Sequence, residues 1–382
     1  MTLSSDTDNI VAALGQRNRV CQVDLTGYQM EKVLAPMRVP FPELTDLQLW
    51  SHDRDNETVI PDTFLGGSAP RLRSVELNSF SFPGLPKLLL SATHLVHLHL
   101  QCIPDSDYIS PEAIVPALSV LSSLESFILE FECSWPDREG SSLPPPNRSI
   151  LPSLADFSFV GPIEYLEELV IRIDTPQLDK ICMEFFPRID YNRTCPQLVQ
   201  FTNRTPMLKA LDEAHVQFHD GTTSLKFRYR TSKSSLDERL INISCSVSHV
   251  QLPSIEQVCN PSLHLLSTVE DLYIEHRYRR LDWTNDPIRN YLWLQFLLPC
   301  IAVKNIYLSK EFAPGIAAAL QGLVGNGITE VLPNMQHIFV EELEPSGPFQ
   351  ENIRQFVAAR QLSSHSIAIS VWDKNANTDM KY

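Results

Sequence analysis

One short pattern of residues recurs along this chain of 382 residues. It consists of an apolar residue, two variable residues, an apolar residue, one variable residue and a last apolar residue, as in Leu44, Leu47 and Leu49. The clear copies that follow begin 28, 23, 29 and 30 positions apart, at Leu72, Leu95, Leu124 and Leu154. Further copies begin at Leu178, Val269, Val303 and Met335, and weaker ones at Val20 and Ile367. Repetition at this spacing is typical of repeat proteins.

The pattern predicts a short strand in each copy. Its last two apolar residues are two positions apart, so both point to one side of a strand and the variable residues point to the other. Helix-like sequence lies between the copies, as at Ser110-Pro111-Glu112, where Ser is a favourable N-cap and Pro a favourable first helical residue. Residues 164–173 and 313–324 are similar.

Strands and helices that alternate at this period predict an α/β leucine-rich-repeat solenoid, or horseshoe. We expect irregular repeats, with parallel strands on the concave face and helices outside. An ordinary doubly wound α/β domain also alternates strands and helices. It does not usually repeat one pattern so many times, and the solenoid is therefore favoured.

We expect a single leucine-rich-repeat domain over residues 1–382, with two departures from the repeat. Residues 134–149 are rich in Pro and Ser and predict a surface loop inserted between repeats. Residues 205–250 contain runs of alternating polarity and predict strands of an irregular repeat region.

Charge and cysteine content restrict the partners and the compartment. The net charge is -15, which disfavours nucleic acid and anionic membranes as ligands and favours a protein target with a basic face. Eight cysteines are scattered without a C-x-x-C pair, as in a reduced protein. We find no secretory signal or membrane-spanning stretch, and expect a cytoplasmic or nuclear protein.

Motifs that carry chemistry are not found. There is no G-x-S-x-G elbow, H-E-x-x-H pair or phosphate-binding loop. His97 and His99 would share one strand face, and His52 could approach them, but no further ligand has metal-site spacing. Solvent-facing histidines explain this cluster better, so we expect no metal, no cofactor and no catalytic residues.

The variable residues of each strand are the candidate binding surface, because solenoids usually bind partners on the concave face. Carboxylates are frequent among them, and Trp50, Tyr273, Tyr307 and Phe339 supply aromatic rings suited to protein interfaces. The predicted protein-binding residues are Asp46, Gln48, Trp50, Glu76, Asn78, His97, His99, Glu130, Asp271, Tyr273, Glu275, Tyr307, Phe339 and Glu341.

Several long segments resemble a large family of fungal F-box and leucine-rich-repeat proteins. They include VPFPELTDLQLW, FLGGSAPRLRSVEL, LPKLLLSATHLVHLHL, YISPEAIVPALSVLSSLESFILEF, EYLEELV, RTPMLKALDEAHVQF and FVAARQLSSHSIAISVWD. The resemblance implies a substrate-receptor subunit of a cullin–RING (SCF-type) ubiquitin ligase, in which an F-box docks on the ligase adaptor and the repeats present the target.

The sequence departs from the family at its beginning, because no Leu/Pro-rich helical F-box precedes the first repeat. The resemblance therefore covers only the recognition part, and a ligase adaptor is an expected partner only if an F-box lies upstream. Two further functions stay open: a stand-alone leucine-rich-repeat scaffold with no ubiquitin link, and, least favoured, an α/β enzyme.

Overall fold

A computed structural model describes most of the chain. The described residues are 2–3, 7–28, 30–53, 58–104, 109–132, 148–186, 195–208, 211–219, 222–229, 240–246, 263–276, 287–323, 330–342, 348–363 and 365–373. The chain divides into unit 1, Met1–Phe186 with Gln200–Met207, and unit 2, Pro187–Val199 with Leu208–Tyr382. The expected inserted loop at 134–149 lies almost wholly outside the described residues, and the expected single domain stays a prediction.

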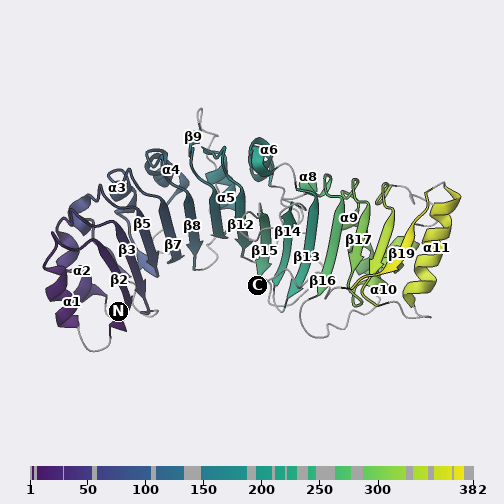
Figure 1. The fold of residues 1–382 in the computed structure, drawn as a ribbon, viewed down its shortest axis with the longest axis horizontal. Coiled ribbons are helices and arrows are strands. Elements are labelled where there is room, and N and C mark those ends of the chain that lie inside the picture. Colours follow the sequence, from purple (N-terminus) through teal and green to yellow (C-terminus); the bar gives the residue numbers. More distant parts are fainter. Residues whose placement is uncertain are drawn as a thin grey trace. The chain divides into compact units, whose positions relative to one another are not determined.

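Unit 1 contains a sheet of parallel strands that lie side by side in chain order (Figure 1). They are β1 (Thr2–Leu3), β2 (Gln22–Gly27), β3 (Asp46–Ser51), β5 (Ser74–Asn78), β7 (His97–Ile103), β8 (Ser126–Phe131), β10 (Asp156–Gly161) and β12 (Lys180–Phe185). The predicted apolar pairs are aligned between neighbours, since Leu47 pairs with Val75 and Leu49 with Leu77. Each copy of the pattern is therefore one strand of a leucine-rich-repeat solenoid.

Short helices connect these strands. They are α1 (Thr7–Leu14), α2 (Glu31–Leu34), α3 (Leu85–Leu89), α4 (Pro111–Ser119), α5 (Ile163–Val170) and α6 (Pro196–Arg204), with 3₁₀ turns η1 (Pro36–Arg38), η2 (Phe64–Gly67) and η4 (Pro206–Leu208). The connections also hold the strand pairs β4 (Thr58–Val59) with β6 (Phe80–Ser81) and β9 (Ser149–Ile150) with β11 (Ile173–Asp174). The Ser110 side chain caps α4 by accepting from the Ala113 amide at 3.3 Å, as the sequence predicted.

The helices cover the apolar side of the strands. Tyr165 of α5 packs against Phe131 and Phe159, with ring centroids 4.8 and 5.9 Å apart. Helices α3, α4 and α5 also contact one another in order. Phe131 and Phe159, the two strand residues of this contact, are at most 2% exposed. In the described part of unit 1, the opposite side of each strand carries no such layer, and we call it the open face.

A recurring turn precedes several of the strands. The amide of the first residue of the pattern donates to the carbonyl three residues earlier, as from Leu44 to Phe41 and from Leu72 to Ala69. Prolines such as Pro42 and Pro70 therefore occupy the second position of a β-turn, where a fixed φ is favourable. Both prolines lie two positions before the first residue of their copy of the pattern, so the turn gives their repetition a structural reason.

Unit 2 has the same architecture with one exception. Its strands are β15 (Leu240–Ser246), β14 (Thr222–Arg228), β13 (Glu213–His219), β16 (Asp271–His276), β17 (Asn305–Leu308), β18 (His337–Val340) and β19 (Ala368–Val371), in sheet order. Strands β13 and β16 to β19 are parallel, whereas β14 runs antiparallel to both β13 and β15. Strand β14 lies in the region 205–250 that the sequence set apart from the regular repeat, and it is antiparallel because β13 and β14 join in a hairpin rather than through a crossover.

The helices of unit 2 are α8 (Leu263–Leu266), α9 (Pro287–Leu297), α10 (Ala313–Gln321) and α11 (Pro348–Leu362). Helix α10 contacts α9 and α11. The core joins helix and strand through Trp293, Phe312 and Phe218, whose ring centroids are 4.7 to 6.3 Å apart. In the part of the chain that is described, no helix combines the length and the apolar character needed to cross a membrane.

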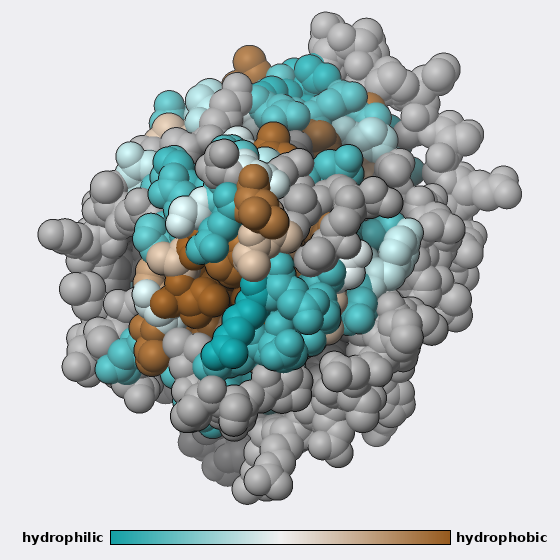
Figure 2. Space-filling view, turned by 90° about the vertical axis from the view of Figure 1, so that its right-hand side faces the viewer, coloured by the Kyte–Doolittle hydropathy of each residue, from teal (hydrophilic) through white to brown (hydrophobic). Residues whose placement is uncertain are grey.

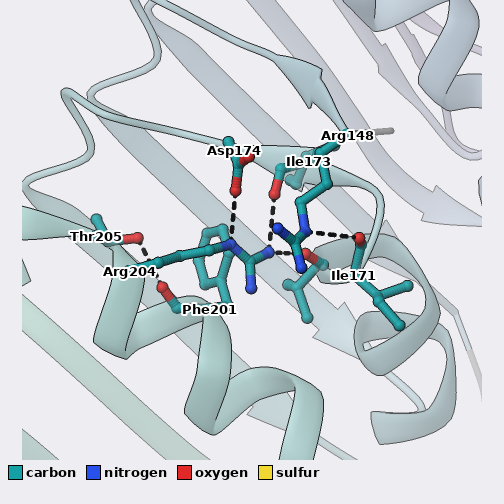
Figure 3. A network of polar contacts seen from close by, with 8 residues as sticks. Arg148, Ile171, Ile173, Asp174, Phe201, Arg204 and Thr205 are labelled. Atoms are coloured by element: carbon teal, nitrogen blue, oxygen red, sulfur yellow. Dashed lines mark hydrogen bonds and ion pairs between the residues drawn. The ribbon is translucent and has the colours of Figure 1, made fainter. Parts of the chain in front are cut away.

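A partly buried cation, Arg204, holds the end of α5 in unit 1 (Figure 3). The Arg204 guanidinium donates to the Asp174 carboxylate at 2.6 Å, to the Ile173 carbonyl at 2.9 Å and to the Val170 carbonyl. The last carbonyls of a helix lack intrahelical donors and carry partial negative charge. Arg204 satisfies these acceptors, and thereby fixes the following turn.

We expect Arg204→Ala to lower the free energy of unfolding by about 2 kcal/mol, because it removes several hydrogen bonds to a charged group. Urea unfolding followed by circular dichroism measures the loss. Arg148→Ala is the matched control, since exposed Arg148 makes one hydrogen bond to the Ile171 carbonyl at 3.2 Å (Figure 3). Equal destabilisation by both variants would contradict this role.

Candidate functional site

The open face of unit 1 carries the predicted site residues of that unit. Strands β3, β5 and β8 alternate strictly between half-buried and buried positions. The half-buried positions hold Asp46, Gln48, Trp50, Glu76, Asn78 and Glu130, and the open side of β7 holds His97 and His99. The sequence therefore placed these residues on the correct side of the strands, while their role in binding stays a prediction.

Polar side chains on this face bond to one another across the strands. Gln48 donates to Glu76 at 2.9 Å, and Asn78 donates to Gln101 at 3.1 Å. These pairs occupy matched register positions on neighbouring strands. The face of unit 1 is thus a polar surface whose side chains hold one another in place.

The histidine cluster is part of this surface. The rings of His97 and His99 are 6.1 Å apart, and His99 hydrogen-bonds to Ser126 at 3.1 Å. Burial lowers the pKa of His99, which favours its neutral form at neutral pH. Within the described ranges, no group of three or more His, Cys, Asp or Glu side chains is arranged to hold a metal ion.

Lys180 and Glu184 of β12 extend the face and were missing from the predicted site. Lys180 forms an ion pair with Asp156 at 2.8 Å. The sequence offered a signal for both, because the copy that begins at Leu178 fixes which side of β12 is open. Lys180 thus adds a cation to a face on which carboxylates are frequent.

Glu130 has a perturbed environment. Burial raises its pKa above the usual glutamate range, and the charge of Glu184 raises it further. Both residues pair in register with Val160, from the strands on its two sides. The carboxylates therefore lie two strands apart on one face, and the charge of Glu184 disfavours ionisation of Glu130.

This pKa gives Glu130→Gln a pH-dependent effect on stability. A carboxyl whose pKa is raised on folding lowers the free energy of unfolding once it ionises. The free energy of unfolding therefore falls as the pH rises above the pKa of the unfolded state, about 4.3. We expect Glu130→Gln to unfold at higher urea than the parent protein at pH 8, and the advantage to vanish below about pH 4.

Glu125→Gln is the matched control, because Glu125 precedes the same strand and is exposed. A gain from Glu130→Gln that is equally large at both pH values would show that ionisation is not its cause.

The open face of unit 2 is built around aromatic rings. Tyr273, Tyr307 and Phe339 occupy matched register positions on β16, β17 and β18, and His215 continues the row on β13. Successive ring centroids are 4.3, 4.2 and 4.6 Å apart, with interplanar angles of 3, 8 and 7°. We call these four residues the aromatic ladder.

Polar rows flank the aromatic ladder. Asn305 donates to Asp271 at 2.6 Å, and Gln217 donates to Glu275 at 2.8 Å. Asp271 and Glu275 are 2% and 8% exposed, so these amide donors compensate carboxylates that the fold takes out of water. Glu341 accepts a long hydrogen bond of 3.4 Å from the Lys310 amide. The predicted Asp271, Glu275 and Glu341 are therefore all beside the aromatic ladder.

Two members of this site were not predicted. His215 was missed because its copy of the pattern has Ala214 as its second apolar residue, between buried Leu211 and Val216. Trp372 directly follows β19, and its ring lies 5.9 Å from Tyr273 and 5.6 Å from Tyr307. Trp372 occupies the same place after its strand pattern as Trp50 does, which could have signalled it.

Among the described cysteines, Cys300 is fully buried, and burial raises its pKa to about 12. A thiol with that pKa stays protonated at neutral pH, whereas the thiolate is the nucleophile. The geometry of both open faces suits noncovalent recognition.

No family model matches the chain, and no curated protein matches it. Among solved structures, the chain is similar to the crystal structure of the leucine-rich repeat-containing protein LegL7 from Legionella pneumophila. The two chains are 13% identical, the match covers 93% of this chain and 97% of that chain, and the TM-score is 0.30. The fold assignment rests on the strand register and the recurring turn of this chain.

Proposed function

We propose that this chain is a protein-recognition module that binds a partner protein through its open faces and catalyses no reaction. The observation that carries the proposal is the aromatic ladder of unit 2 with its flanking carboxylates. Aromatic side chains at the centre of a contact surface, with polar groups around them, are typical of binding hot spots. Stacked rings also lose little conformational freedom on binding, because their neighbours already fix them.

Charge supports a basic target. The open positions of β16, β17 and β18 include Asp271, Glu275 and Glu341, and none of them is Lys or Arg. The whole chain carries a net charge of -15. A partner with a basic face would be attracted at long range and repelled less on docking than an acidic one.

The resemblance to F-box and leucine-rich-repeat proteins supports a finer proposal: the bound protein is a target for ubiquitination. The ligase adaptor would then bind outside the repeats described here. Unpaired cysteines such as exposed Cys21 suit the cytoplasm or nucleus, where such ligases and reduced thiols occur together.

We expect the double variant Trp50→Ala and Tyr307→Ala to lose its partner without unfolding. Each substitution removes an aromatic side chain from one open face, and hot-spot losses of about 2 kcal/mol correspond to roughly 30-fold weaker binding. Affinity capture from a fungal extract, quantified by mass spectrometry, compares the variant with the parent chain.

The matched control is Leu90→Ala with Tyr291→Ala, because both side chains are exposed and lie outside the open faces. Proteins captured equally by the parent, the double variant and the control would contradict the proposal. Enrichment of a ligase adaptor and a cullin by the parent chain would support the ubiquitin link, whereas another protein without them would support a stand-alone scaffold.

A further inference from the structure

One further aromatic side chain of this protein, that of Trp372, already contacts the aromatic ladder. Trp372 donates its backbone amide to Val340 at 2.8 Å, and its indole reaches back over β17 to β16. The ring is tilted by 60° to Tyr273 and by 67° to Tyr307. Trp372 is only 6% exposed.

The stacking of the ladder decides which part of each tyrosine meets Trp372. Tyr273 is stacked between His215 and Tyr307, and Tyr307 is stacked between Tyr273 and Phe339. Both faces of each tyrosine ring are therefore occupied, and only the ring edges are left for a further contact. Ring edges carry partial positive charge and attract the face of another aromatic ring. The ladder thus offers a site for one aromatic side chain.

The segment that places Trp372 in this site is weakly held. Strand β19 pairs with β18 alone, at the edge of the sheet. Val371 is 62% exposed, and Figure 2, which views this end of the molecule, shows apolar side chains open to solvent. The indole N–H of Trp372 is buried without a hydrogen-bond acceptor. A ligand side chain that occupied the same site with its own polar atoms hydrogen-bonded would be favoured over Trp372.

We propose that Trp372 is an intramolecular stand-in for an aromatic side chain of the partner, and that this side chain stands among basic residues. The inference rests on the proposed function and names the chemistry that the unit 2 face selects. The aromatic requirement comes from the ring edges of Tyr273 and Tyr307. The basic requirement comes from Glu341, the carboxylate beside them that is not buried, and from the net charge of -15. Binding then requires displacement of Trp372.

A defined peptide tests this inference on the full chain. The probe is a fluorescein-labelled heptapeptide, Gly-Ser-Arg-Trp-Arg-Ser-Gly, measured by fluorescence anisotropy. We expect Trp372→Ala to bind it with at least tenfold lower Kd than the parent chain, because the site is vacated. Peptides with Ala in place of Trp, or Glu in place of both Arg residues, should lose that gain. Adding Tyr307→Ala to Trp372→Ala should also abolish it.

A second measurement does not depend on the stability of that variant. In the parent chain labelled with 5-fluorotryptophan, saturating peptide should shift the ¹⁹F resonance of Trp372, assigned with Trp372→Phe, and leave that of buried Trp293 unchanged. An unshifted Trp372 resonance, or equal Kd values for the parent and Trp372→Ala, would overturn the inference. So would a concentration-dependent dimer that disappears in Trp372→Ala, because a second copy would then be the occupant. Partner capture that still depends on Tyr307 would leave the proposed function standing in each case.

Discussion

The burial of two apolar side chains from every repeat is the constraint on which the rest of this structure depends. A strand such as β5 has one apolar side, carried by Val75 and Leu77, and it cannot remove that side from water alone. In-register stacking on β3 and β7 places like positions next to one another and buries them. Because successive residues point to opposite sides of a strand, this stacking also fixes which residues are open. The open faces are therefore a consequence of the core.

Register also brings like positions of different repeats into contact on the open face. In unit 1 this puts Gln48 beside Glu76, and hydrogen bonds result. In unit 2 the same position holds Tyr273, Tyr307 and Phe339, and a stack of rings results. One backbone arrangement thus supports two chemistries, because the open residues do not contribute to the apolar stack that holds the strands together.

Much of the fold and of the candidate surface could be predicted because the pattern encodes both. Apolar residues at fixed spacing identified β3, β5, β7, β8, β10, β12 and β16 to β18, and the variable residues between them identified the open side. The antiparallel β14 could not be predicted this way, because hairpin pairing depends on a turn and on partners distant in the sequence. His215 was missed because Ala214, a small apolar residue, occupies the second apolar position of its copy, where the other copies have a larger side chain.

The contact of Trp372 with the aromatic ladder shows what a linear pattern omits. Its position after β19 matches that of Trp50 after the first clear copy, so its side of the strand was readable. Its contact with Tyr273 was not, because β16 and β19 are separated in the sheet by β17 and β18. A side chain must reach across two strands to make that contact, which only a large ring can do. The property that makes Trp372 suitable for covering the ladder is therefore its size, and the same requirement applies to any partner residue that replaces it.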